Sequence, residues 1–458
     1  MADDAAFDLL IRDATIVAPH RKIPHAWVVE SADVGIHDKK IAAIGSLSSA
    51  YGKAEIQARG LTLLPGAIDT QVHFRDPGFP EKEDMSSGSR AALFGGVTTF
   101  FDMPNTQPPT LTAIDVADKM SRAEKRAWVN YAFYAGASPS NINKLAELEK
   151  LPHVCGVKIF MGSSTGNLVI GSDENLEATV SKLTRPFAVH AEDDARLKER
   201  RHLVEENPGH VEMHPEWRDV ETALIATKKI AALAKKYGKR VHILHISTAE
   251  EIEFFKSNCK AEAANPFGHL TFEITPQHLT LTAPECYEKL GTRAQMNPPI
   301  RDKRHQDALW TAIRDGLATT IGSDHAPHTL AEKNKTYPQS PSGMAGVQTL
   351  LPIMLNHVHL GRLSLTRLVE LTSSNPARLF GLSSKGSIEI GKDADFALVD
   401  LKAKKIITNS WIQSRCGWTP FDGFTVQGWV VATIVGGQIS MRDGEVIGSP
   451  KGSPALKT

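Results

Sequence analysis

The chain has 458 residues, a hydrophobic content of 41% and 52 basic residues against 52 acidic ones. These values describe a globular protein that can bury a large core, and the balanced charge gives no support to nucleic acid or an anionic membrane as a partner. We therefore expect a small-molecule partner.

The sequence carries no sign of a secreted or membrane protein. The opening stretch MADDAAFDLL is acidic and lacks the basic start and apolar core of a signal peptide, and no apolar run is long enough for a transmembrane helix. We expect a cytoplasmic protein. The absence of any CxxC pair favours reduced thiols over disulfides or a structural zinc site for the four cysteines, Cys155, Cys259, Cys286 and Cys416.

Residues 7–63 contain short extended stretches such as FDLLIRDATIV and WVVESADVGIHD. From residue 64 the pattern changes, because β-rich runs alternate with amphipathic helical segments such as TAIDVADKMSRAEKRA and VETALIATKKIAALAKKYG. We expect eight strands, within LPGAIDTQVHF, GGVTTFFDMPN, VNYAFYAGA, CGVKIFMG, PFAVHAED, RVHILHIS, LTFEITPQHL and ATTIGSDHAPH. Eight parallel strands with crossover helices close a (β/α)8 TIM barrel, whose active site lies at the carboxyl ends of the strands.

Residues 386–447 return to the extended style of the first part, with GSIEIGKDADFALVDL and GWVVATIVGGQISMRDGEVI. We therefore predict an α/β protein with three sequence regions. Residues 64–385 form the barrel, and residues 1–63 and 386–458 pair into one small β-sandwich domain built from both chain ends.

Polar side chains stand at the carboxyl ends of most predicted barrel strands. A single histidine there is more often a hydrogen-bonded core residue than a ligand, but several polar groups at the same end of different strands are hard to attribute to chance. In DTQVHFRDPG, residues 71, 73 and 75 share one parity and are expected to share one face. The whole set is Gln71, His73, Arg75, Asp102, Asn105, Lys158, His190, His245, Asp324 and His328.

Lys158 lies between Val157 and Ile159 and would place an ammonium group inside the barrel. Burying that charge is costly unless it is paired or lost. A lysine with a lowered pKa could form a Schiff base, or its neutral amine could add carbon dioxide and become a carbamate that bridges two cations. A salt-bridged structural lysine is the third interpretation.

The residues around Lys158 favour the carbamate, because His190, His245 and Asp324 supply the nitrogen and oxygen donors that zinc prefers. Asp324 follows a Gly and a Ser at a strand end, where a carboxylate can serve as general base. In RVHILHIS the two histidines face opposite ways on a strand, so we expect His242 to be packed away from the site. A charged stretch predicts that three further histidines are solvated, namely His202, His210 and His214.

Seven motifs occur in a fixed order along the chain: DTQVHFRDPG, MPNTQPP, GVKIFMGSSTG, VHAED, HILHIS, MNPPIR and GSDHAPH. Together they resemble the long-type dihydroorotases of the amidohydrolase superfamily, which also holds allantoinases and hydantoinases. The resemblance covers roughly residues 64–385, and the flanking β segments fit that family's composite domain. It implies reversible hydrolysis of dihydroorotate to N-carbamoyl-aspartate in pyrimidine biosynthesis.

The resemblance further implies a binuclear zinc site. His73 would hold the first metal, His190 and His245 the second, and carbamylated Lys158 would bridge the two, with Asp324 as both ligand and proton shuttle. Contacts with substrate are implied for Arg75, Asn105, Asn297 and His328, and for backbone groups near Ala345 and Gly346.

Arg75 bears on the choice of substrate. A guanidinium in a dry pocket seeks a planar anion, and dihydroorotate has a carboxylate that allantoin and simple hydantoins lack. An allantoinase or hydantoinase is the alternative within the same reaction class. In the other interpretation, Arg75 forms an ion pair with Asp76 or Asp102 and does not contact the substrate.

Gln71 departs from the family pattern, which has a histidine at that position. A carboxamide oxygen is a weaker zinc donor than imidazole, so the first metal is expected to be labile, with Gln71 as a weak ligand or a hydrogen-bond partner. The departure also keeps open a non-catalytic role as a partner of aspartate carbamoyltransferase.

Two further expectations concern assembly and the rim of the barrel. A symmetric homodimer is the default for a protein of this kind. The stretch TLAEKNKTYPQSPSGMAGV, residues 329–347, is rich in Gly, Pro and Ser and is expected to be a mobile loop over the site or a merely exposed one.

Overall fold

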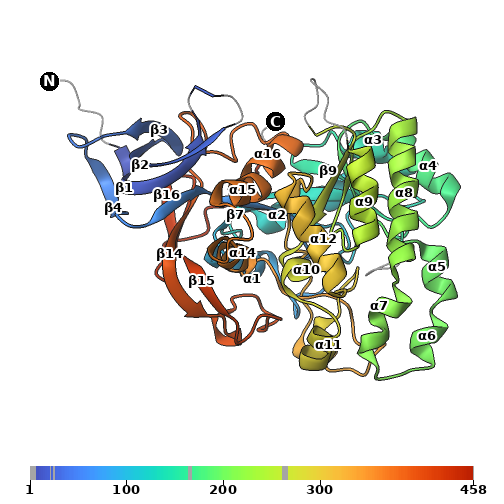
Figure 1. Ribbon diagram of the computed structural model, residues 1–458. Coiled ribbons are helices and arrows are strands. Elements are labelled where there is room, and N and C mark those ends of the chain that lie inside the picture. Colours follow the sequence, from blue (N-terminus) through green and yellow to red (C-terminus); the bar gives the residue numbers. More distant parts are fainter. Residues whose placement is uncertain (1–6, 21, 24–25, 163–167, 260–266, 457–458) are drawn as a thin grey trace.

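The computed structural model describes residues 7–20, 22–23, 26–162, 168–259 and 267–456. Figure 1 shows two parts: a barrel with helices around its outside and a curved sheet made from the two ends of the chain. Within the described residues, no helix combines the length and the apolar character needed to cross a membrane. The four cysteines are free thiols.

The barrel contains the eight predicted strands, in sequence order around an all-parallel sheet. Nearly every strand residue is buried, because helices cover the outside and side chains fill the inside. A bridge between Val72 and His325 joins the first strand to the segment that follows the last, and so nearly closes the ring. The strands are β6 (Ala67–Val72), β7 (Val97–Asp102), β8 (Asn130–Gly136), β9 (Val154–Phe160), β10 (Phe187–His190), β11 (Val241–Ile243), β12 (Leu270–Ile274) and β13 (Thr320–Ile321).

The helices between the strands follow from ordinary amphipathic patterns and caps. In α8 (Val220–Lys236), the Asp219 side chain accepts a hydrogen bond from the backbone N–H of Thr222, and Lys235 and Lys236 lie in the last turn, where they complement the helix dipole. The other crossover helices include α1 (Met85–Phe94), α2 (Ala113–Ala123), α3 (Leu145–Leu148), α4 (Asp173–Lys182), α9 (Ala249–Asn258) and α12 (Lys303–Arg314).

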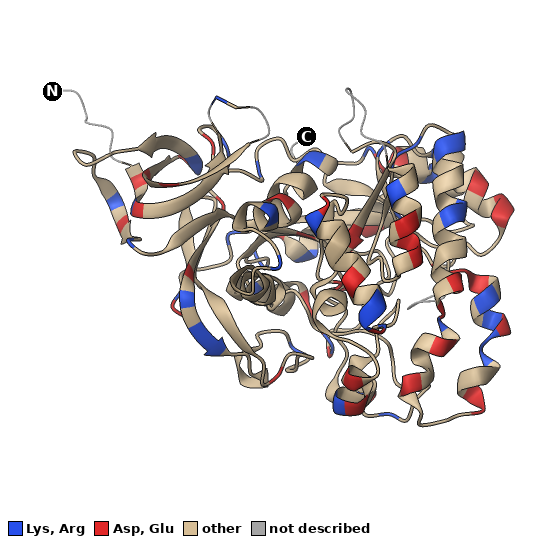
Figure 2. Ribbon diagram, viewed as in Figure 1, with Lys and Arg blue, Asp and Glu red and all other residues tan. Residues whose placement is uncertain are grey.

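The remaining helices are α5 (Asp194–Glu199), α6 (His202–Glu205), α7 (His214–Trp217), α10 (Pro276–Thr280), α11 (Glu285–Leu290), α13 (Leu330–Lys333), α14 (Leu350–His359), α15 (Leu365–Val369) and α16 (Asn375–Leu379). Acidic and basic residues are interspersed on the outer helices (Figure 2), where Lys229 of α8 pairs with Asp173 of α4 at 2.8 Å.

The two chain ends form one nine-stranded sheet with the order β17-β16-β15-β14-β5-β1-β2-β3, and β4 pairs with β1. The central join is the antiparallel pair of β5 and β14, which brings residues 62–65 beside residues 396–399. The predicted union of the two ends is thus confirmed. The strands are β1 (Phe7–Pro19), β2 (Trp27–His37), β3 (Lys40–Gly45), β4 (Gly52–Gln57), β5 (Thr62–Pro65), β14 (Phe396–Ile406), β15 (Thr425–Val435), β16 (Gln438–Arg442) and β17 (Glu445–Val446).

Two details of the sheet differ from the sequence regions given above. Strand β5 spans the boundary placed between residues 63 and 64 and belongs to the sheet. The polar tail leaves the sheet and runs along the barrel, where Tyr131 of β8 donates its N–H to Ser453 O at 3.1 Å and accepts from Ala455 N at 2.8 Å.

Candidate active site

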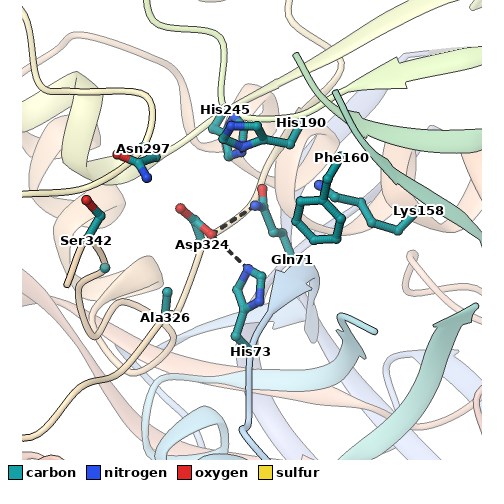
Figure 3. Close-up of a pocket in the computed structure, with 11 residues that line it drawn as sticks. Gln71, His73, Lys158, Phe160, His190, His245, Asn297, Asp324, Ala326 and Ser342 are labelled. Atoms are coloured by element: carbon teal, nitrogen blue, oxygen red, sulfur yellow. Dashed lines mark hydrogen bonds and ion pairs between the residues drawn. The ribbon is translucent and has the colours of Figure 1, made fainter. Parts of the chain in front are cut away.

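A small enclosed pocket of about 20 Å³ lies at the carboxyl ends of the barrel strands. The strands supply its polar residues near their carboxyl ends or in the segments directly after them. The residues that line it are Gln71, His73, Lys158, Phe160, His190, His245, Asn297, Asp324, Ala326, Ser342 and Gly343. All six predicted metal ligands are therefore brought together, and Figure 3 shows them pointing into one space.

One side of the pocket is built around Asp324. Its Oδ1 accepts a hydrogen bond from Gln71 Nε2 at 2.9 Å and lies 3.2 Å from His73 Nε2. Asn105 lies 2.7 Å from the other ring nitrogen of His73 and fixes the orientation of that ring. Burial raises the pKa of Asp324 to about 7, although the charge of Lys158 opposes the rise. A carboxylate with a pKa near neutrality can both take up and release a proton.

The other side is a pair of imidazoles from neighbouring strands. His190 Nδ1 lies 3.1 Å from His245 Nε2, and burial lowers the pKa of both rings. Both are therefore neutral near pH 7, which is the form that binds metals. His190 Nε2 also lies 2.8 Å from a carboxylate oxygen of Glu192, which forms an ion pair with Arg218.

Glu192 was missed in the sequence. Burial alone would raise its pKa, but the Arg218 guanidinium and His190 bring it down to about 2, so it stays charged and holds the ring of His190. Its place two residues after His190 was the only signal in the sequence, because β10 ends at His190 and strand parity does not extend to residue 192. Arg218 carried no comparable signal, since it comes from a segment far along the chain.

Lys158 lies on β9 with its amine fully buried, and no described residue forms a hydrogen bond with it. Its Nζ stands 4.7 Å from the centre of the Phe160 ring. Burial lowers the pKa of Lys158 to about 7, against the opposing charges of Asp324 and Glu273. The structural salt bridge considered for this lysine is therefore absent among the described residues. Near neutral pH a large share of the side chain is the nucleophilic free amine.

In the part of the chain that the structure describes, three pocket atoms are buried without a hydrogen-bond partner: Lys158 Nζ, Gln71 Oε1 and His245 Nδ1. Unpaired buried polar atoms are rare, and a cluster of them around one space indicates an additional binding partner. Within the described residues no three His, Cys, Asp or Glu side chains form a metal site by themselves. A metal here would therefore also need Gln71 and a modified Lys158, and with these the set of nitrogen and oxygen donors fits zinc.

Backbone strain marks the same residues. Arg75, His245 and Asp324 have φ values of 60°, 43° and 44°, a region that residues other than glycine rarely adopt. Strained backbone of this kind clusters at functional sites. The parity argument fails for Arg75, because β6 ends at Val72 and the chain turns before reaching it.

Arg75 is not among the residues that line the pocket, and only 3% of its surface is exposed. Its Nη2 is 3.2 Å from His328 Nε2, and its Nε donates to Pro327 O at 3.2 Å. The proposed pairs with Asp76 and Asp102 are not formed, because Asp76 pairs with Arg122 and Arg126 and Asp102 with Lys119. Burial lowers the pKa of Arg75 to about 10. Among the described residues no carboxylate forms an ion pair with this buried cation.

The remaining predicted substrate residues divide into two groups. Asn297 lines the pocket, whereas His328 does not, and its Nε2 lies 3.1 Å from the carbonyl oxygen of Ser342. Ala345 and Gly346 do not line it. The Gly346 N–H instead donates to His325 Nδ1 at 3.0 Å.

The expected rim loop is packed rather than merely exposed. Within residues 329–347, Lys333 and Tyr337 are buried, and Ser342 and Gly343 form part of the pocket wall. Lys333 Nζ donates to Pro341 O at 2.7 Å. The end of the motif GVKIFMGSSTG falls on residues 163–166, which lie outside the described residues.

Two predictions about further histidines have different outcomes. His242 is packed away from the pocket as expected, with Thr271 Oγ1 at 2.9 Å and Thr320 Oγ1 at 3.0 Å. His202 and His210 are exposed, also as expected. The prediction for His214 was wrong, because its side chain is fully buried between the pocket wall and residues 329–347.

Comparison with known proteins places this architecture in a family. The sequence pattern of the amidohydrolase family matches residues 62–440. The L-hydantoinase (dihydropyrimidinase) of Arthrobacter aurescens superposes with a TM-score of 0.90 at 29% identity, covering 98% of this chain and 99% of that one. The dihydropyrimidinase of Brevibacillus agri NCHU1002 gives 0.86 at 27% identity, covering 96% of each chain. The chain belongs to the amidohydrolase family.

Curated relatives narrow the comparison within that family. A dihydroorotase of Pyrococcus abyssi is 36% identical over 428 residues, which are 93% of this chain and 94% of that protein. A dihydroorotase of Methanosarcina mazei is 35% identical over 402 residues, 86% of this chain and 87% of that protein. The predicted resemblance to dihydroorotases is confirmed.

Proposed function

We propose that this protein is a dihydroorotase, which hydrolyses dihydroorotate reversibly to N-carbamoyl-aspartate in pyrimidine biosynthesis. The observation that carries the proposal is the buried guanidinium of Arg75, which donates to Pro327 O, next to the pocket residue Ala326, and has no carboxylate partner among the described residues. A desolvated cation of this kind is best satisfied by a planar anion that makes two parallel hydrogen bonds. The carboxylate of dihydroorotate is such an anion, and the names of the curated relatives point the same way.

The reaction proposed here depends on zinc held by side chains of this pocket. His73 and Gln71 would hold one ion, His190 and His245 a second, and Lys158 would bridge them once its neutral amine had added carbon dioxide. The unpaired buried atoms of Lys158, Gln71 and His245 support this set. When bound, zinc polarises a ring carbonyl and makes water acidic enough to attack near neutral pH. Glu192 holds the ring of His190, and its own ion pair with Arg218 keeps it charged.

Asp324 is the proposed proton carrier. Its carboxylate is held by Gln71 and lies beside His73, so it faces the space where water and the substrate ring would meet. With a pKa near 7 it can accept a proton from the attacking water and return it to the leaving ring nitrogen. The same exchange in reverse closes the ring of N-carbamoyl-aspartate.

A hydantoinase is the second candidate, because the solved structures cited above are of that type. Ring opening is chemically alike in all cyclic ureides, so the two candidates differ in what Arg75 does. For a hydantoinase, Arg75 would make no contact with a substrate that lacks a carboxylate.

The test measures turnover of dihydroorotate, hydantoin and allantoin by zinc-loaded wild-type protein and by Arg75→Ala. For a dihydroorotase we expect turnover of dihydroorotate, and a rise of KM by about 100-fold in the variant from the loss of charge-assisted hydrogen bonds. Arg314→Ala, at the end of α12, is the control and should behave as wild type. Turnover of hydantoin or allantoin alone, unaffected by Arg75→Ala, would assign the second candidate.

A further inference from the structure

His214 begins α7 and is fully buried, although it lies in a charged stretch of sequence. Its Nε2 stands 3.0 Å from Met296 O and 3.0 Å from Asn297 Oδ1, and its Nδ1 stands 3.1 Å from the Tyr337 hydroxyl. A single imidazole thus joins three segments that are remote in sequence. One of them contributes Asn297 to the pocket wall.

The partners of His214 determine where its proton lies. A backbone carbonyl such as Met296 O can only accept, so Nε2 must carry the hydrogen. Nδ1 then has a free lone pair and accepts from the hydroxyl of Tyr337. The ring stays neutral, since burial lowers the pKa of His214 to about 3. The donor and acceptor roles are therefore fixed by the surroundings.

The fixed proton of His214 in turn decides the orientation of the Asn297 amide. The atom beside a donating Nε2 must be an acceptor, so the carboxamide oxygen of Asn297 faces His214 and its NH₂ group faces the other way. Figure 3 shows that nitrogen directed toward the space beside Asp324. An NH₂ group in this position donates to a carbonyl or carboxylate oxygen of a ligand, whereas the flipped amide would present an acceptor and repel it.

We propose that His214 is a positioning residue that holds Asn297 as a hydrogen-bond donor toward the substrate. The inference rests on the proposed function only in requiring that the pocket binds a cyclic ureide or its ring-opened product. Because the same ring accepts from Tyr337, the donor orientation of Asn297 is tied to residues 329–347, which also supply Ser342 and Gly343 to the pocket. The backbone of Tyr337 is held in addition by Gly209 N, which donates to its carbonyl at 2.7 Å.

The experiment is a double-mutant cycle between His214 and Asn297. It is read as KM and kcat for the ureide that the zinc-loaded wild type hydrolyses, and as the dissociation constant of the ring-opened product of that ureide. Loss of one hydrogen bond to substrate should raise KM by about 10-fold in His214→Leu, with kcat changed far less. In the Asn297→Ala background the same substitution should change KM by less than about 2-fold, because the amide it orients is gone. His214→Gln, which can still donate to Asn297, should recover part of the loss.

Two controls separate positioning from folding. His210→Leu removes an exposed histidine of the same segment and should leave both constants unchanged. If His214→Leu does not fold, Tyr337→Phe keeps the packing and removes only the hydroxyl, and it should raise KM about 3-fold in wild type and not in Asn297→Ala.

Equal effects of His214→Leu in both backgrounds would overturn the inference, as would an unchanged KM in Asn297→Ala or a protein that binds no ureide. The cycle is independent of which ureide is the substrate. A wild type that opens hydantoin but not dihydroorotate would reject the proposed function and still decide the role of His214.

Discussion

A lysine is buried in each of two regions: the mouth of the barrel, and the seam where the barrel meets the sheet of the chain ends. The surroundings shift the pKa of the two lysines in opposite directions. Lys385, in the seam, pairs with Asp395 at 2.5 Å and Asp393 at 3.1 Å. Burial alone would lower its pKa, but the two carboxylates outweigh that effect and raise it. Lys158, at the mouth, has no such partner among the described residues, and burial lowers its pKa to about 7.

The difference separates a structural cation from a reactive amine. Asp395 also accepts from Asn130 of β8 at 2.9 Å and from Gly436 N at 2.7 Å, so the Lys385 network joins the barrel to the sheet. Every charge in that network is satisfied. Among the described residues, Lys158 Nζ lies near other buried polar atoms that have no hydrogen-bond partner. Burying such atoms without partners lowers the stability of the fold, so their presence is useful only if a ligand binds there.

The largest expected effect is that of Lys158→Ala. The proposed zinc site predicts that this variant binds zinc more than about 100-fold more weakly and loses turnover, since the loss of a residue that merely supports a ligand already costs about 10- to 100-fold. Metal content by mass spectrometry and turnover of dihydroorotate measure this. Small carboxylic acids should restore part of the activity by replacing the carbamate. Full zinc occupancy in the variant would contradict the bridging role.

Lys385→Met should have the opposite profile. Removing one partner of a buried ion pair leaves the carboxylates uncompensated, so we expect a loss of about 3–5 kcal/mol in the free energy of unfolding. The kcat of the folded protein should be unchanged, because the seam does not reach the pocket. Denaturant unfolding and turnover measure the two quantities. Lys402→Met, at an exposed position on β14, is the matched control. A fall in kcat without a fall in stability would mean that the seam lysine is not merely structural.

The architecture was predictable from the sequence, because the barrel strands are largely apolar runs, and polar residues lie near or just beyond the carboxyl ends of most of them. Lys158 was the clearest signal, since a lysine between Val157 and Ile159 in a buried strand has few structural explanations. The exact strand ends were not predictable. The left-handed turns at Arg75, His245 and Asp324 are imposed by packing around the pocket, not by local preference.

The contacts of His214 and Glu192 were not predicted for a different reason. His214 lies 83 positions from Asn297 and 123 from Tyr337, and its local sequence is charged, so a short window indicates solvent exposure. Glu192 meets Arg218 across 26 positions. Such contacts form only when the barrel has folded, and one sequence without aligned relatives does not contain them.

The two lysines should also differ in how their contribution to the free energy of unfolding depends on pH. For metal-free, bicarbonate-free protein, Lys158 has a folded pKa of about 7 against 10.5 when unfolded. Between these values the unfolded state binds more protons, so the free energy of unfolding of wild type, relative to Lys158→Met, should rise with pH from 7 to 10.5 by up to about 4 kcal/mol.

The folded pKa of Lys385 is raised instead, so the stability that Lys385 contributes is fully present below pH 10.5 and is lost only as pH rises through the higher folded value. The difference between wild type and Lys385→Met should thus stay constant over that window, as urea unfolding at a series of pH values would show. A constant difference for Lys158→Met as well would mean that Lys158 keeps its charge in the folded protein, and its amine would not be the free nucleophile that carbamate formation requires.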